Sequence, residues 1–129
     1  SDLNIKAEDL SAIILRFKNN VIAEAHLDYF QQPSARNCKI IGTRGTLTWD
    51  IESNTVRFYD VKNKKWIEKL KLPNYDINMT YIKELTHIIE CIQSKSKPIN
   101  DLKEGIYTLK VALDVKNSSK LKKTLSVGR

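Results

Sequence analysis

The sequence predicts an α+β domain, with an open, mostly antiparallel β-sheet and two main helices covering one of its faces. In residues 10–72, apolar and polar side chains alternate with period two between turn residues, which is typical of antiparallel strands. From residue 77 onward, apolar residues recur every three or four positions, which is typical of amphipathic helices. A run of strands followed by helices favours an α+β arrangement over alternating βαβ units.

The strand half is predicted to form a meander of three hairpins. Lys18-Asn19-Asn20 suits the first turn, because asparagine tolerates left-handed backbone conformations. Residues 42–45 form the second turn, where two glycines can supply positive φ, and residues 62–65 form the third. The predicted strands are residues 12–17, 21–30, 38–41, 46–50, 56–61 and 66–72.

The first helix is predicted to run from about Asn78 to Ser94, and Pro98 breaks the chain after it. The second helix begins at Asn100 or Asp101, because Glu104 follows Asp101 by three residues as in a capping box. It is expected to end near Ser118, and residues 124–127 are expected to return as a last edge strand. The stripes expected to face the core are Ile77, Tyr81, Leu85, Ile88 and Ile92 in the first helix, and Leu102, Ile106, Leu109 and Leu113 in the second.

Composition is typical of a soluble globular chain. The 129 residues suffice for one domain, and 41% of them are hydrophobic while 29% are charged. No apolar run is long enough to cross a bilayer, and the first residues lack the pattern of a secretory signal, so no membrane association is expected. Cys38 and Cys91 are isolated in apolar surroundings, which favours buried free thiols and a cytoplasmic location.

The net charge of +7 permits attraction to anionic partners. Much of the excess lies in two lysine clusters, residues 62–65 and 116–123, and such clusters are usually solvated. Nucleic-acid binding requires basic residues along one continuous face, so nucleic acid is not expected as a partner. A free-standing basic module that binds nucleic acid or another polyanion stays open as the alternative function.

The second strand has two different faces, because successive side chains alternate across a strand. One face, with Val21, Ala23, Ala25, Leu27 and Tyr29, is apolar, and the other mixes apolar and charged residues. A mixed face is typical of a polar interface, so the chain is expected to form a homo-oligomer through it. The subunit-contact candidates are Ile22, Glu24, His26, Asp28 and Phe30.

No complete catalytic or metal constellation is found. Glu24, His26 and Asp28 alternate along one strand, where each lies about 6–7 Å from the next. This spacing is too splayed for one metal ion, and cross-strand salt bridges are favoured instead. His87 lacks a second histidine at metalloprotease spacing and is interpreted as a structural or surface residue. Residues 42–45 lack the helix and lysine of a phosphate-binding loop.

Six segments follow one another in a recognisable order, with the string IGTRGTL at residues 41–47 as the most specific of them. The segments are residues 8–20, residues 26–36, residues 41–47, residues 76–85, residues 98–105 and Ser118-Ser119. In this order they resemble the C-terminal domain of the Gfo/Idh/MocA family, the glucose-fructose oxidoreductase and inositol dehydrogenase relatives. The resemblance covers nearly the whole chain.

This resemblance implies a sheet with helices on one face, whose other face packs against a second subunit. It also implies a pyridine-nucleotide oxidoreductase that acts on a sugar, inositol or nucleotide-linked sugar. Hydride would pass between a hydroxyl carbon of the substrate and the nicotinamide.

The family's glycine-rich nucleotide fingerprint, its catalytic lysine and its aspartate-to-histidine stretch belong upstream of the part that this chain resembles. Residues 1–129 are therefore expected to be a single C-terminal substrate and dimerisation domain, with the N-terminal nucleotide-binding domain absent. The chain is expected to bind no cofactor and to be inactive alone, while NAD or NADP is implied for the full-length protein.

The resemblance also implies a few contacts to the sugar-type substrate. Arg36 could pair a phosphate or carboxylate through its guanidinium, or be an exposed strand-edge arginine. Tyr81 could instead pack in the core, and Asn78 could cap the helix. The substrate-binding candidates are Tyr29, Gln31, Arg36, Asn78 and Tyr81.

Overall fold

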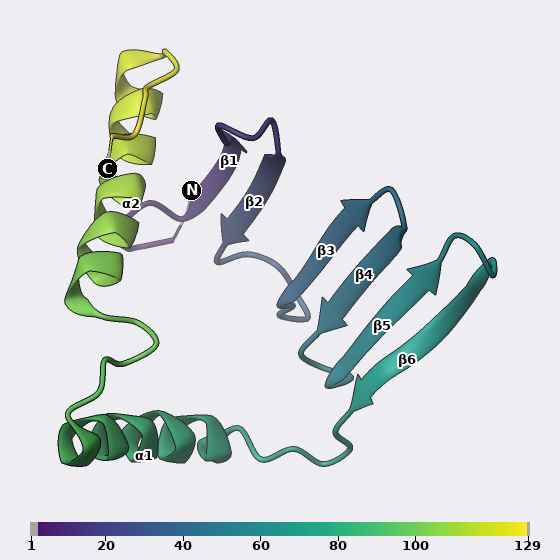
Figure 1. The fold of residues 1–129 in the computed structure, drawn as a ribbon. Helices are drawn as coiled ribbons and strands as arrows, with labels where there is room; N and C mark the ends of the chain where they lie inside the picture. Colours follow the sequence, from purple (N-terminus) through teal and green to yellow (C-terminus); the bar gives the residue numbers. More distant parts are fainter. Residues whose placement is uncertain (1–2, 129) are drawn as a thin grey trace. The chain divides into compact units, whose positions relative to one another are not determined.

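The computed structural model describes residues 3–128 and confirms the α+β class, with six antiparallel strands in two sheets and two helices (Figure 1). The chain divides into two compact units, a strand unit up to Ile77 and a helix unit from Asn78.

Strands β1 (Leu10–Arg16) and β2 (Ile22–Asp28) form a two-stranded sheet of their own. Asn20 adopts φ 64° in the turn between them, as the sequence predicts. The amide of Tyr29 extends the pairing by donating to the carbonyl oxygen of Asp9 at 3.1 Å. The expected open sheet is thus divided, because residues 29–36 form an irregular connection with no ladder between β2 and β3.

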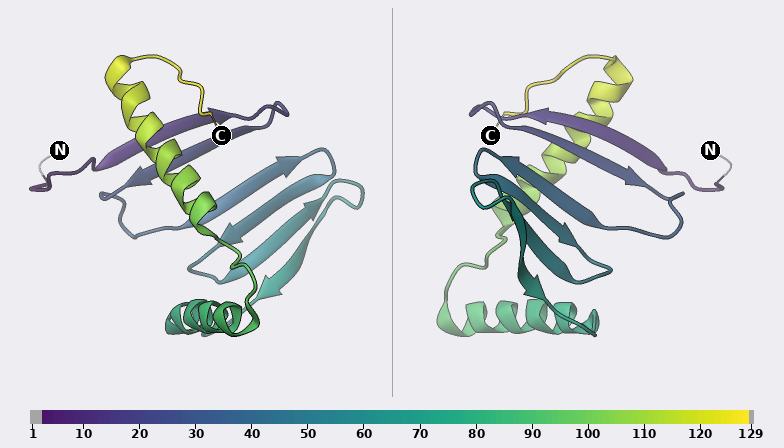
Figure 2. Two further views of the ribbon diagram at one scale, coloured as in Figure 1. Left: turned by 60° about the vertical axis from the view of Figure 1, so that its left-hand side comes forward. Right: turned by 90° about the vertical axis from the view of Figure 1, so that its right-hand side faces the viewer.

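The second sheet has four strands in chain order, lying side by side in Figures 1 and 2. Directly opposite residues share a face, so Ile40, Leu47, Phe58 and Ile67 form an apolar row across the sheet. A β-bulge shifts the register of β5 and β6 between Val56 and Arg57. The strands are β3 (Asn37–Gly42), β4 (Gly45–Asp50), β5 (Thr55–Asp60) and β6 (Lys65–Lys71).

Gly45 explains why the string at residues 41–47 needs a glycine. It is the buried residue that opens β4, and a Cβ atom there would lie 2.1 Å from the carbonyl oxygen of Tyr59 and 2.6 Å from the Phe58 ring. Gly45 has φ 159°, whereas Gly42 lies outside the positive-φ region. The expectation that both glycines supply positive φ is therefore wrong for Gly42, and close backbone approach is the main requirement at Gly45.

Helix α1 (Asn78–Ser94) has the predicted bounds, and helix α2 (Leu102–Leu121) ends one turn later than predicted. The predicted cap is present, since the Asp101 carboxylate accepts from the amide of Glu104 at 3.0 Å. The strand predicted at residues 124–127 is wrong. That segment is tied to α2 instead, because Lys110 Nζ donates to the carbonyl oxygen of Gly128 at 2.7 Å and Ser118 Oγ to that of Lys123.

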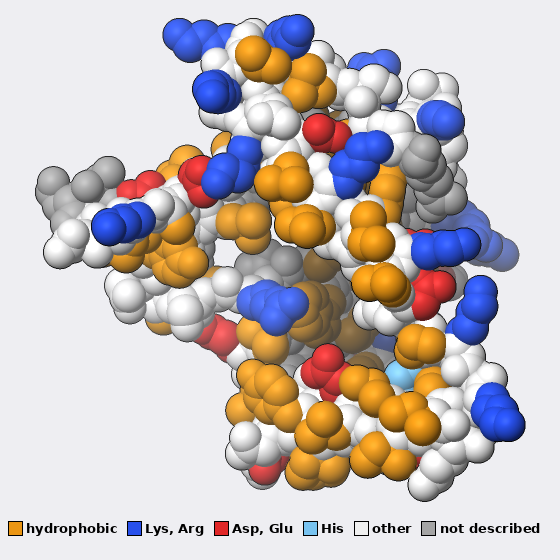
Figure 3. Space-filling model, turned by 90° about the vertical axis from the view of Figure 1, so that its left-hand side faces the viewer, with side chains coloured by type: hydrophobic (Ala, Val, Ile, Leu, Met, Phe, Trp, Pro, Cys, Tyr) orange, Lys and Arg blue, Asp and Glu red, His pale blue; other side chains and the backbone are white. Residues whose placement is uncertain are grey.

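Few side chains are buried. Among the described hydrophobic residues only Cys91, 7% exposed, is fully buried, whereas the other free cysteine, Cys38, is exposed, contrary to the prediction. The predicted stripes of α1 and α2 are exposed, and Figure 3 shows hydrophobic side chains along α1 in the lower part of the view. In α2 the half-buried side is a different one, around Tyr107, Val111 and Val115. Leu125 and Val127 of the returning tail are also half-buried.

Candidate functional site

The turn after β2 holds two of the predicted substrate contacts. Asp28 Oδ1 accepts from the amides of Phe30 at 2.8 Å and Gln31 at 2.7 Å, so the carboxylate organises residues 28–31. Tyr29 lies in this turn with its side chain 69% exposed. The structure thus brings Tyr29 and Gln31 together on one short, hydrogen-bonded turn.

The electrostatics of this turn favour an ionised Asp28. The amide of Gln31, then that of Phe30, lowers the pKa of the Asp28 carboxyl, and burial opposes this only in part. His26 Nε2 lies 2.9 Å from Asp28 Oδ2. The predicted salt bridging across strands is therefore replaced here by a pair along β2, and Asp28 is a structural anion that anchors the turn.

Arg36 precedes β3 and is exposed. Its guanidinium carbon lies 6.0 Å from the centroid of the Trp49 ring, at the outer limit of a cation–π contact. The carbonyl oxygen of Arg36 accepts from the amide of Ile51 at 3.1 Å, so the backbone is fixed while the guanidinium faces solvent. This arrangement leaves the guanidinium available to a carboxylate or phosphate.

The two remaining substrate candidates belong to the helix unit. Asn78 is the first residue of α1, and Tyr81 follows within its first turn. Tyr81 is exposed, and both substrate contact and core packing stay predictions for it. The five candidates thus lie in two units, with Tyr29, Gln31 and Arg36 in the strand unit.

The predicted subunit-contact residues of β2 share their face with residues of β1. Cross-strand pairing places Ile14 opposite Glu24 and Arg16 opposite Ile22. Ile14 is 76% exposed, and Ile22 and Phe30 are also exposed. We call Leu10, Ala12, Ile14, Arg16, Ile22, Glu24, His26 and Asp28 the mixed face.

An aromatic cluster on the four-stranded sheet was not predicted. Tyr59 and Trp66 face each other across β5 and β6, with ring centroids 5.4 Å apart. The Arg57 guanidinium carbon lies 4.8 Å from the centroid of the Trp66 ring, and Trp66 stays 45% exposed. Period-two spacing places Arg57 and Tyr59 on one face of β5. To place Trp66 of β6 on the same face, the register between β5 and β6 must be known, and the β-bulge in this pair hides it from the sequence.

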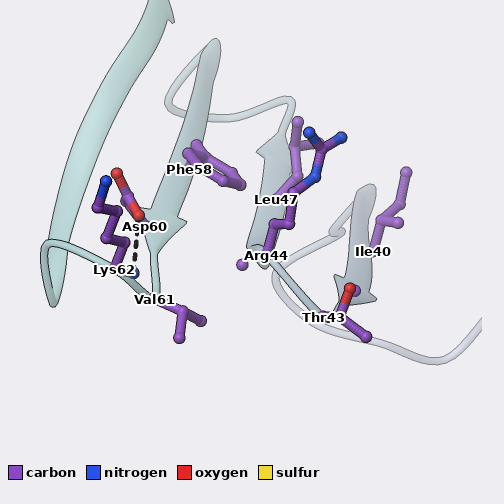
Figure 4. Close-up of a pocket in the computed structure, with 10 residues that line it drawn as sticks. Ile40, Thr43, Arg44, Leu47, Phe58, Asp60, Val61 and Lys62 are labelled. Atoms are coloured by element: carbon purple, nitrogen blue, oxygen red, sulfur yellow. Dashed lines mark hydrogen bonds between the residues drawn. The ribbon is translucent and has the colours of Figure 1, made fainter.

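One concavity lies where the β3–β4 and β5–β6 turns approach each other (Figure 4). It has a volume of about 920 Å³ and is open to solvent, with Ile40, Leu47 and Phe58 on its apolar side. Arg44 and Lys62 contribute positive charge. The sequence indicated only a hairpin turn here, since residues from the two turns meet only in the folded sheet.

Asp60 in this concavity serves its own turn. Its pKa is lowered, first by the side-chain amide of Asn63, which donates to Oδ2 at 2.7 Å, and also by the backbone amides of Asn63 and Lys62. Asp50 behaves similarly after β4, where the Ser53 hydroxyl, at 2.6 Å, is the main cause of its lowered pKa. These carboxylates close turns, and neither is poised as a general base.

Within residues 3–128, no group of three or more potential ligands is arranged to hold a metal ion. Neither α1 nor α2 combines the length and hydrophobicity that a bilayer crossing requires. Around Tyr29, Gln31 and Arg36 the geometry is that of turns and a strand end presenting exposed polar side chains.

Comparison with known proteins gives one positive finding. The model of an oxidoreductase family, described as its C-terminal alpha/beta domain, matches residues 2–127. No curated protein matches the chain significantly. No solved structure matches it significantly. Because the match covers nearly the whole sequence, the chain belongs to the Gfo/Idh/MocA oxidoreductase family and represents its C-terminal domain.

Proposed function

We propose that this chain is the substrate-binding and oligomerisation domain of an NAD(P)-dependent dehydrogenase that acts on a sugar, an inositol or a nucleotide-linked sugar. The family match over residues 2–127 carries the proposal. On this proposal the chemistry needs a nucleotide-binding domain that supplies the cofactor and the proton relay, so the domain alone is inactive. On the same proposal, the turn at residues 28–31 and Arg36 form part of the polar wall of the substrate pocket.

The substrate contribution rests on what the strand unit exposes. Tyr29 offers an aromatic face and a hydroxyl on a turn that Asp28 holds in place. Arg36 adds a guanidinium that recognises a phosphate or carboxylate in a bidentate manner. A nucleoside diphosphate sugar would use both groups, whereas an unphosphorylated hexose or inositol would use chiefly the turn.

NMR titration of the ¹⁵N-labelled chain with a hexose, an inositol and a nucleoside diphosphate sugar tests this contribution. We expect shifts that concentrate on the amides of residues 28–37 and, for the phosphorylated ligand, weaken in Arg36→Ala and Arg36→Lys. Lys39→Ala, which removes a nearby exposed cation, is the matched control. Shifts spread over the lysine clusters, together with tight and salt-sensitive DNA binding, would support the polyanion alternative.

Oligomerisation is proposed to use the mixed face, with a second copy of the chain as the partner. Arg16 and Glu24 are diagonal neighbours on this face, so a two-fold arrangement could bring opposite charges together. Ile14 and Ile22 supply exposed apolar surface between them. A self-complementary patch of this kind suits an isologous dimer.

Sedimentation velocity tests this interface. Ile22→Asp is expected to shift the chain toward monomer, because it buries an unpaired charge in the contact. Val21→Asp is the matched control, since Val21 is similarly exposed and is the adjacent residue along the chain. A monomeric wild-type chain at high concentration, or equal effects of both substitutions, would contradict the assignment of this face.

A further inference from the structure

The segment between α1 and α2 is fastened to α1 by a histidine side chain. His87 lies in the third turn of α1, and its Nε2 accepts from the backbone amide of Ile99 at 3.1 Å. Both residues belong to the helix unit. Pro98, which precedes Ile99, has no N–H of its own, so the Ile99 amide is the first donor after the proline.

Packing contributes little to this attachment. The side chain of Ile99 is 82% exposed, so burial of the isoleucine does not hold the loop in place. Nearer to α1, the Ser96 amide donates to the carbonyl oxygen of Cys91 at 3.0 Å, and Ser96 Oγ lies 2.9 Å from Ser94 Oγ. These bonds close the end of α1, whereas the His87 bond secures the later part of the loop.

The bond requires one protonation state of the ring. An imidazole nitrogen can accept a hydrogen bond only when it carries no proton, so His87 must be neutral with its proton on Nδ1. Cys91 Sγ lies 3.6 Å from Nε2 and 3.9 Å from Nδ1, and this buried thiol packs against the ring. A proton on Nε2 would point at the Ile99 N–H, so the two donors would repel each other.

We propose that His87 is a pH-sensitive latch: the neutral imidazole holds the α1–α2 loop against α1, and protonation releases it. Other charged groups near the ring in sequence are Lys83, Glu84 and Glu90 on α1, and Lys95, Lys97 and Asp101 in the loop. They carry both signs, and the hydrogen-bond acceptor of the Ile99 amide is His87 Nε2. The latch goes beyond the proposed dehydrogenase role and does not depend on it.

Amide hydrogen exchange of the full chain, read by NMR, tests the latch. The protection factor of the Ile99 amide is expected to fall roughly two- to twelvefold between about pH 8 and about pH 5, the range that spans imidazole titration and the usual strength of one hydrogen bond. The Ser96 amide should keep its protection, because its acceptor is a carbonyl. Nitrogen shifts should place the proton of the neutral ring on Nδ1.

Variants separate the latch from general acid effects. His87→Gln offers an acceptor that does not titrate, so Ile99 protection should become independent of pH. His87→Leu should abolish protection at both pH values, and His26→Gln, which removes the other histidine, should leave the wild-type response intact. An unchanged Ile99 amide while His87 titrates, a neutral ring protonated on Nε2, or equal loss at Ser96 would overturn the proposal.

Discussion

Replacement of Gly45 by alanine is the sharpest stability prediction of the structure. The new Cβ atom would lie 2.1 Å from the carbonyl oxygen of Tyr59 and 2.6 Å from two atoms of the Phe58 ring. The ring could rotate away, but the Tyr59 carbonyl belongs to the neighbouring strand β5, so β4 and β5 would have to move apart. Overpacking of this kind, with the backbone strain it adds, costs about 3 kcal/mol.

The other glycines provide matched controls. A Cβ atom on Gly42 would meet nothing closer than the carbonyl oxygen of Gly45 at 3.8 Å, so Gly42→Ala should change stability by less than about 0.5 kcal/mol. Gly105 lies inside α2 with nothing within 4 Å of its Cβ position. Gly105→Ala should therefore stabilise the helix by about 0.5–1 kcal/mol through helix propensity alone.

Urea unfolding followed by tryptophan fluorescence measures the effect. Trp49 and Trp66, the two tryptophans of the chain, both lie in the four-stranded sheet, so the signal reports this sheet. With an m-value of about 1.5 kcal/mol per molar, Gly45→Ala should lower the midpoint by about 2 M. A Gly45→Ala midpoint equal to that of the wild type, or an equal drop in Gly42→Ala, would refute the close-approach argument.

Three further outcomes follow from local contacts. Asp101→Ala should lower helicity by circular dichroism and cost about 1 kcal/mol by loss of the α2 cap, whereas Asp101→Asn should retain most of it. Because the pKa of Asp28 is lowered from 3.8, its carboxylate stabilises the 28–31 turn above that value, and this stabilisation is lost as pH falls through the lower folded pKa. The chemical shift of the Gln31 amide should follow this loss in an acid titration, and Asp28→Ala should abolish the pH-dependent change. A thiol reagent should modify exposed Cys38 much faster than buried Cys91 in the native chain, and equal rates would contradict the burial of Cys91.

Local chemistry made much of the fold predictable from the sequence. Asparagine at the first turn and the capping box at Asp101 act over a few residues, so their signals survive without knowledge of the tertiary structure. Helix α1 begins and ends where periodicity placed it. Strand bounds shifted by at most two residues in either direction, because alternation of side chains does not define where the hydrogen-bonded ladder begins and ends.

The failures arose where distant residues decide the outcome. The segment at residues 124–127 has β-branched and apolar character, but its path is set by bonds from Lys110 and Ser118 of α2. The sequence around Cys38 is apolar, which favoured burial of its thiol. Cys38 is nevertheless exposed, because it lies on β3, an edge strand of the four-stranded sheet. Periodicity also could not choose between two sides of α2, since its apolar residues occur on both.

The candidate site residues stay a prediction, and the sequence indicated only part of their local structure. The family resemblance indicated Tyr29, Gln31 and Arg36, but not that Asp28 would fasten the turn with Tyr29 and Gln31 through two amides. The aspartate at the end of β2 was the sequence feature that could have indicated this hydrogen-bonded turn. Asp50 and Asp60, which also end strands, accept from backbone amides of the following turns in the same way. The concavity beside Arg44 and the cluster around Trp66 depend on strand pairing, which residue spacing alone does not define.

The most direct test of the proposed function is reduced-nicotinamide formation with a panel of hexoses, inositols and nucleotide-linked sugars. The chain is assayed alone and as part of a protein that also carries the family's nucleotide-binding domain. The domain alone should give no turnover, whereas the two-domain protein should oxidise one substrate class, with Arg36→Ala lowering kcat/KM and Lys39→Ala leaving it unchanged. Turnover by residues 1–129 alone, or a two-domain protein without nicotinamide-dependent activity on any of these classes, would contradict the account.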